Sequence, residues 1–151
     1  MKKIIIIILL FISLSNCGFQ PIYLNKDIKK LEFKKITSKG SSKINNKIIQ
    51  ALAITENSQN KNLEELILNS VYEIQETSKN SQGVVKTYST SVSVDLSINK
   101  NENIIANKVF SQNFSYNNNT NKFELKKYQD NIEKNLIEEI TREILLYLNT
   151  L

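Results

Sequence analysis

The first twelve residues constrain this chain most strongly. Met1-Lys2-Lys3 is followed by an unbroken apolar run, Ile4 to Ile12, and then by small polar residues. A positive start, a short apolar core and small residues after it are the build of a secretory signal. Such a run in helix reaches only ~14 Å, against a hydrocarbon core of ~30 Å, so it is too short to span a membrane. The alternative is a buried N-terminal helix, which two terminal lysines followed by isoleucines disfavour.

Cys17, the chain's one cysteine, lies just past this run. Leu14-Ser15-Asn16-Cys17 resembles a bacterial lipobox, in which the signal is cut before the cysteine and the thiol carries a diacylglycerol. Leu14 and Ser15 fit that pattern, whereas Asn16 stands where Gly or Ala is usual. A single cysteine cannot form an internal disulfide. We therefore expect a signal peptide over 1–16, cleavage between Asn16 and Cys17, and acyl groups on Cys17 as the only bound group, each buried CH₂ adding ~0.8 kcal/mol of anchoring.

The composition leaves few routes to catalysis. The sequence has no histidine, and Gly18, Gly40 and Gly83 are too scattered for a phosphate-binding loop. With Cys17 acylated, no Cys/His nucleophile pair or His/Cys metal site can be built. Neighbouring carboxylates such as Glu64-Glu65 point apart on a helix or strand. The sequence therefore predicts a protein that is not an enzyme, and a lipid-anchored hydrolase using carboxylates is the enzymatic alternative.

Charge is unevenly distributed along the chain. The formal net charge is +5, and residues 17–47 contain eight lysines against Asp27 and Glu32. A positive segment next to the membrane would be attracted to the anionic phosphates of a bacterial envelope. The alternative is an ordinary solvated basic face in a chain rich in Lys, Asn and Ile. The residual charge after removal of the leader is mild, so no nucleic-acid partner is indicated.

Hydrophobic periodicity predicts the element order β-α-β-β-β-α in one domain over 28–151, after an extended tether over 17–27. Strands are expected over 28–36, 63–77, 84–98 and 103–116, helices over 43–53 and from Asn121 to the C-terminus, and a turn over 37–41. Ser41 or Ser42 can cap the first helix, and Asn121 with Glu124 three places on approximates a capping box for the second.

The faces of these elements predict how they pack. In the third strand, Val92, Val94, Leu96 and Ile98 alternate with Ser91, Ser93, Asp95 and Ser97. In the fourth strand, the expected inner face is Ile104, Ala106, Phe110, Phe114 and Tyr116. The last helix carries an apolar stripe made of Ile132, Leu136, Ile137, Ile140, Ile144, Leu145 and Leu148. We interpret this stripe as core, the alternative being a partner-binding helix. The fold class expected is α+β, a two-layer sandwich of a four-stranded, mostly antiparallel sheet with two helices on one face. The polar face is left for water or a partner.

The start of the mature chain resembles a known family. Cys17-Gly18-Phe19-Gln20-Pro21-Ile22-Tyr23 is similar to the Cys-Gly-Phe-x-Pro-Leu-Tyr start of mature LPS-assembly lipoproteins, the LptE family, with Ile22 in place of the common Leu. Element order and size match that family along essentially the whole chain. The resemblance implies a lipid anchor on the periplasmic face of the outer membrane. It also implies a plug inside the LptD β-barrel that takes part in inserting lipopolysaccharide into the outer leaflet, with no covalent chemistry.

Two lysines are the candidates for contact with lipopolysaccharide. Lys79 and Lys86 flank the expected turn between the second and third strands, and lysine is a competent point-charge ligand for the phosphates of lipid A. The alternative for each is an ordinary surface lysine.

The residue after the cysteine bears on which membrane the protein is sorted to. Gly18 stands there, and not the Asp that often retains lipoproteins in the inner membrane, so sorting to the outer membrane is favoured. The competing function is a pilotin-like or accessory subunit of another secretion or assembly machine.

Overall fold

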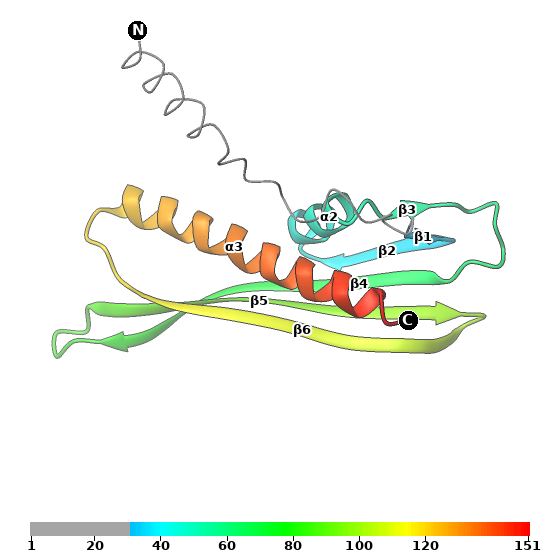
Figure 1. The fold of residues 1–151 in the computed structure, drawn as a ribbon. Helices are drawn as coiled ribbons and strands as arrows, with labels where there is room; N and C mark the ends of the chain where they lie inside the picture. Colours follow the sequence, from blue (N-terminus) through cyan, green and yellow to red (C-terminus); the bar gives the residue numbers. More distant parts are fainter. Residues whose placement is uncertain (1–30) are drawn as a thin grey trace, which may run out of the picture.

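The computed structural model describes residues 31–151 (Figure 1). The signal peptide, its cleavage site at Asn16 and Cys17, and the tether fall in residues 1–30, outside the described residues. The elements are β1 (Glu32–Phe33), β2 (Lys35–Gly40), α2 (Ser42–Ala51), β3 (Thr55–Glu56), β4 (Glu65–Lys79), β5 (Val85–Lys100), β6 (Asn103–Asn117) and α3 (Lys122–Leu148). None of the helices described here combines the length and apolarity that crossing a membrane requires.

Two layers make up the fold. One layer is a four-stranded sheet in the order β2-β4-β5-β6, in which β2 pairs parallel with β4 and the other pairs are antiparallel. Helices α2 and α3 lie over the same face of this sheet (Figure 1). The predicted α+β sandwich with a mostly antiparallel sheet is therefore confirmed. The one parallel pair of this four-stranded sheet arises because α2 carries the chain from the end of β2 back over the sheet toward the start of β4.

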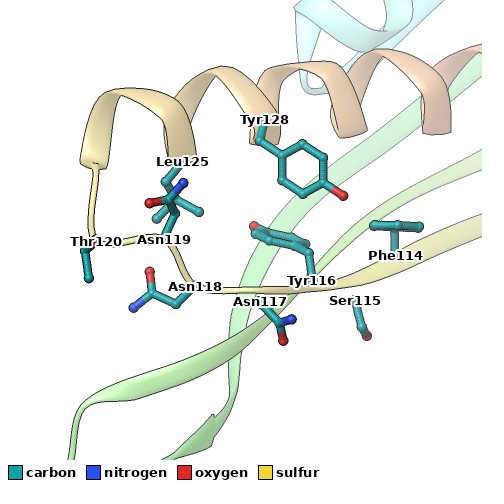
Figure 2. Close-up of a pocket in the computed structure, with 9 residues that line it drawn as sticks. All are labelled: Phe114, Ser115, Tyr116, Asn117, Asn118, Asn119, Thr120, Leu125 and Tyr128. Carbon is teal, nitrogen blue, oxygen red and sulfur yellow. The ribbon is translucent and has the colours of Figure 1, made fainter.

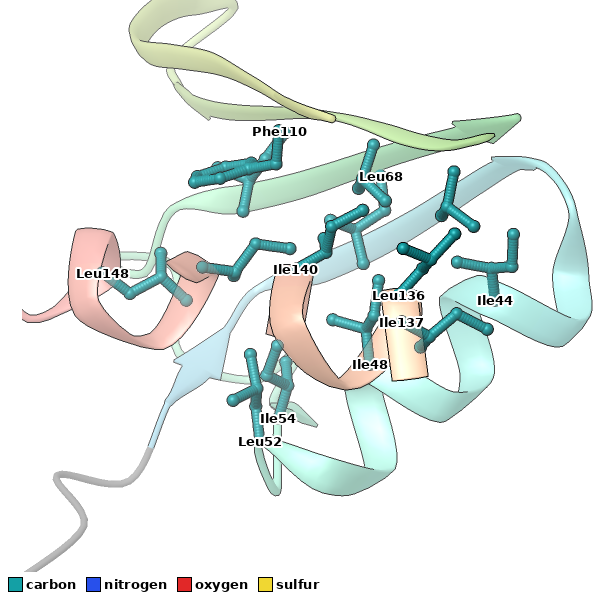
Figure 3. Packing of buried hydrophobic residues seen from close by; sticks show 14 of the residues in the cluster. Ile44, Ile48, Leu52, Ile54, Leu68, Phe110, Leu136, Ile137, Ile140 and Leu148 are labelled. Carbon is teal, nitrogen blue, oxygen red and sulfur yellow. The ribbon is translucent and has the colours of Figure 1, made fainter. Parts of the chain in front are cut away.

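The core lies between the helices and the sheet (Figure 3). Its fully buried side chains come from α2, β4, β5, β6 and α3, and they include Ile44, Ile48, Leu66, Leu68, Val92, Val94, Leu96, Phe110, Ile140 and Ile144. The predicted stripe of α3 is buried except for Leu145, which is partly exposed. Alternation along β5 is also confirmed, since Val92 to Ile98 bury every second side chain. Burial of these side chains is the main source of the stability of the fold.

Caps fix where both helices begin. The Ser41 side chain accepts from the Ile44 amide at 3.5 Å, and the Asn121 side chain accepts from the amides of Phe123 at 3.0 Å and Glu124 at 3.3 Å. In a full capping box the Glu124 side chain would accept from the Asn121 amide. Here that amide donates to Asn119 Oδ1 at 2.9 Å instead. Both caps satisfy amides that have no partner inside the helix.

The predicted first strand and the turn after it need correction. Residues 37–40, expected as a turn, belong to β2, whose partners run from Lys35 with Glu65 to Gly40 with Ser70. Pairing with β4 overrides the turn-like composition, because strand propensity depends on sheet context. The chain upstream forms a separate two-residue strand, β1, which pairs parallel with β3, and neither was predicted as a separate element.

The predicted inner face of β6 is correct in its middle and wrong at two positions. Phe110 and Tyr116 are buried, but Ile104 is 67% and Phe114 45% exposed. The register between β5 and β6 shifts between Ile98 and Asn99, so Ile104 pairs with Asn99 and its side chain lies on the sheet face opposite the helices. Strand β6 is also an edge of the sheet, where one flank of each side chain has no neighbouring strand.

Candidate functional site: an open sheet face, a distal hairpin and a pocket beside it

The sheet face opposite the helices is covered by no other described element (Figure 1). We call it the open face. Small polar side chains dominate its centre, namely Ser89, Ser91, Ser93 and Ser97 of β5 and Asn107, Ser111 and Asn113 of β6. The strand register sets them in rows, with Ser93 opposite Ser111 and Ser91 opposite Asn113. Hydroxyl and amide groups both donate and accept hydrogen bonds, so this face can match a polar partner surface.

Part of the open face is ordered by its own hydrogen bonds. The Asn107 amide nitrogen donates to Asp95 Oδ1 at 2.9 Å and to Ser97 Oγ at 2.7 Å. Two exposed apolar side chains, Val71 at 46% and Val109 at 58%, interrupt the polar rows. The open face therefore combines hydrogen-bonding side chains with a few exposed apolar ones.

The free edge of β6 lies beside the open face. Among residues 31–151, β6 has a strand neighbour on one side only. Its fifteen residues include a single charged side chain, Lys108. The opposite edge strand, β2, has six residues and carries Lys35 and Lys39. Charge and shortness are the usual protection of a sheet edge, so β2 is protected and β6 is not.

The turn between β4 and β5 holds both predicted lysines at one end of the molecule. We call residues 79–86 the distal hairpin. Its turn is built by Asn80, whose side-chain oxygen accepts from the amides of Gln82 at 3.0 Å and Val84 at 2.8 Å. Lys79 is the last residue of β4, and its ammonium pairs with Glu76 Oε2 at 2.9 Å. The ammonium of exposed Lys86 has no ion-pair or hydrogen-bond partner among the described residues, so it is the freer of the two point charges.

A pocket that sequence reasoning missed opens beside the distal hairpin, between the end of β6 and the first turns of α3 (Figure 2). Residues 114–120 line it from the strand and loop side, and Leu125 and Tyr128 line it from the helix, around a volume of about 630 Å³. Asn118 ties the pocket to the hairpin, because its amide donates to the Lys86 carbonyl at 2.7 Å and its side chain to the Val85 carbonyl at 2.8 Å. The feature of the sequence that could have pointed to this pocket is the run Asn117 to Asn119, which lies between aromatic residues.

Three carboxylates of the described residues form ion pairs that reach across the fold. Glu64 accepts from Lys100 at 2.7 Å, and neighbouring Glu65 pairs with Lys34 at 3.2 Å. The hydrogen bond from Lys100 lowers the pKa of Glu64 below its ordinary value. Glu133, buried between α2 and α3, pairs with Lys43 at 2.7 Å. Within residues 31–151, no group of three or more metal-ligating side chains lies together.

Solved structures share this fold, although no protein-family model and no curated protein matches the sequence. Rare lipoprotein B from Shewanella oneidensis is 10% identical over 77% of this chain and 94% of its own, with a TM-score of 0.58. A minor lipoprotein from Acinetobacter baumannii is 13% identical over 75% of this chain and 88% of its own, with a TM-score of 0.53. Lipoprotein B from Nitrosomonas europaea is 10% identical over 83% of this chain and 88% of its own, with a TM-score of 0.56.

The fold is one that bacterial lipoproteins share. At these identities the likeness shows the fold alone. The neighbours nevertheless span most of this chain and nearly all of their own, so the sandwich as a whole is common to them.

Proposed function

We propose that this chain is an outer-membrane lipoprotein of the LPS-assembly type. In this proposal it is anchored on the periplasmic face by acyl groups on Cys17, without catalytic chemistry. It acts as the plug and assembly partner of an LptD-type β-barrel, which carries lipopolysaccharide to the outer leaflet. The support comes from the N-terminal segment Cys17 to Tyr23, from the lipobox before it, and from a fold shared with bacterial lipoproteins.

The open face is the observation that carries the partner part of the proposal. Large outer-membrane barrels have polar interiors. The serines and asparagines at the centre of this face suit such a lumen because each small side chain loses little rotamer freedom when it is ordered, and the charged side chains of the face are Asp95 and residues of β2 and β4. The weakly protected edge of β6 is consistent with the same setting, since enclosure in a partner shields an edge from other chains.

The distal hairpin carries the ligand part of the proposal. Within residues 31–151 the Lys86 ammonium has no partner, whereas the Lys79 ammonium is shared with Glu76. Phosphate groups of lipid A would attract both charges, and Lys86 more strongly. The Asn80 side chain orders the backbone of the turn between the two lysines.

Affinity capture tests the partner. The full chain is tagged at its C-terminus, expressed in its own cells and purified from detergent-solubilised envelopes. Co-purification of a large outer-membrane β-barrel together with lipopolysaccharide is the expected result. A secretin ring in its place would identify the pilotin-like alternative and overturn the proposal.

Intact mass tests the anchor separately. The expected product begins at Cys17 and carries the added mass of a diacylglycerol, with or without a further acyl chain. A chain that still holds residues 1–16 and a free thiol would remove the lipid anchor from the account.

A further inference from the structure

The pocket between β6 and α3 has a chemistry unlike the rest of the distal end. No charged side chain lines it, although lysines and glutamates surround it in the sequence. Its lining combines aromatic rings with the polar strand end and loop of residues 117–120, of which Asn117 turns its side chain to the opposite side of the strand from Tyr116 and Tyr128 (Figure 2). An ionic ligand would lose its hydration here without meeting a countercharge. A wholly apolar ligand would leave the amides without partners.

The aromatic part of the pocket is held rigid. Tyr116 is buried, and its hydroxyl is fixed by Thr90 Oγ1 at 3.1 Å and by the Gln129 amide nitrogen at 2.9 Å. Its ring stacks on Tyr88 with centroids 5.8 Å apart and meets the Tyr128 ring edge to face at 5.7 Å. These contacts place the Tyr128 ring without covering it. A site whose aromatic wall is already positioned loses little entropy when a ligand binds.

Two rings at this pocket still expose apolar surface to water. Tyr128 is 46% and Phe114 45% exposed, and both line the cavity (Figure 2). An aromatic ring offers a flat, electron-rich face that attracts polarised C–H groups. A pyranose ring has such C–H groups on one face and hydroxyls around its rim. The rings would therefore take the face of a sugar, and the polar groups of the loop 118–120 that are not used within the chain, such as the Asn119 side-chain nitrogen, would take its hydroxyls.

We propose that this pocket binds a neutral sugar ring. The volume of about 630 Å³ falls within the ~300–1,000 Å³ that is usual for small-molecule sites. The source of this sugar would be the saccharide part of lipopolysaccharide, and in this respect the inference rests on the proposed function. By strand alternation, Lys86 lies on the same sheet face as Tyr88 and Tyr116. A ligand with phosphate next to sugar would reach the Lys86 ammonium and the pocket together.

The test is an amide NMR titration of the full chain, purified in a detergent without a sugar headgroup. The probe is lipid-free core oligosaccharide from lipopolysaccharide, in phosphorylated and dephosphorylated forms. Both forms are expected to shift the amides of residues 117–120 and of Tyr128. Tyr128→Ala is expected to weaken binding about tenfold or more. The matched control is Phe123→Ala on the same helix, which is 74% exposed and does not line the pocket.

Each outcome of this titration decides for or against the pocket. Equal binding by the two variants, or shifts that avoid residues 117–120, would overturn the proposal. Binding of the phosphorylated form alone, with displacement by inorganic phosphate, would make the ligand an anion and overturn it as well. Asn119→Ala, a change at an exposed side chain of the pocket loop, gives a second variant if Tyr128→Ala perturbs the fold. Barrel capture is measured independently, so failure of the sugar site leaves the proposed function standing.

Discussion

Gly40 shows how one residue joins the sheet to the first helix. It ends β2 with φ of +72°, and a Cβ at this position would run into the Ser70 carbonyl oxygen on β4. The following residue, Ser41, donates its amide to that same carbonyl at 2.9 Å, and the Ser70 hydroxyl donates back to the Ser41 carbonyl at 3.0 Å. This exchange also explains why a buried serine interrupts the apolar face of β4: its hydroxyl has a partner.

Gly40→Ala is expected to lower the free energy of unfolding by at least about 2 kcal/mol, because left-handed strain is joined by a backbone clash. Gly83→Ala is the matched control. Gly83 has a similar φ of +79° but open space around it, so that variant is expected to lose only about 1 kcal/mol. Urea unfolding measures both. Equal losses would show that the close approach at Ser70 does not constrain the fold.

Glu64 links folding stability to pH. The Lys100 ammonium, 2.7 Å away, holds the pKa of Glu64 below its ordinary 4.5 in the folded chain. The pair therefore stabilises the fold above about pH 4.5, and this contribution is lost as pH falls through the lower folded pKa. Because the pair is at the surface, Glu64→Gln is expected to cost roughly 0.5 kcal/mol at about pH 6 and almost nothing at about pH 3. A cost that grows on acidification would contradict this assignment.

Lys86 and Lys79 are expected to differ in their effect on lipopolysaccharide binding. Lys86→Glu should weaken binding several-fold, and Lys79→Glu less, because Lys79 already shares its charge with Glu76. The double variant should keep the melting temperature of the parent chain. Lys47→Glu, an exposed change on α2, serves as the control. Unchanged binding by the double variant would remove both lysines from the proposed site.

At the scale of elements, α3 organises the core. Its stripe packs on β5 and β6, and α2 packs beside it. Ile140 is fully buried in the middle of the stripe, whereas Leu146 on the same helix is 62% exposed. Ile140→Ala is expected to cost about 2–5 kcal/mol, and Leu146→Ala within about 0.5 kcal/mol. Chemical unfolding checks both, and a large loss at Leu146 would point to a covered surface on that side of the helix.

The elements also show what periodicity can and cannot predict. The alternation of apolar and polar side chains in β5 and the apolar stripe of α3 each depend on burial of one face of a single element. Both could therefore be predicted from the sequence. The extension of β2 to Gly40 depends on pairing with β4, which no local pattern records. The exposure of Ile104 depends on a register shift between β5 and β6, which no local pattern records. The pocket depends on how the chain turns between Tyr116 and Tyr128, which the run of asparagines there does not specify.

At the scale of the whole molecule, the sandwich separates structural from interactive surfaces. One sheet face is used for the core, and the other stays open with its rows of serines and asparagines (Figure 1). The distal end gathers the hairpin lysines and the uncharged pocket within one hydrogen-bonded unit, through Asn118. Such an arrangement suits a protein that works by being held in place and by fitting a partner and a ligand.

Photo-crosslinking in cells tests this account most directly. A crosslinking residue replaces Ser93 at the centre of the open face, and a matched one replaces Glu139 on the exposed side of α3. The account predicts that the Ser93 position captures a large outer-membrane β-barrel and that the Glu139 position captures it much less. Capture of a different assembly from Ser93, or no capture there while Glu139 captures the barrel, would contradict the assignment of the open face as the partner surface.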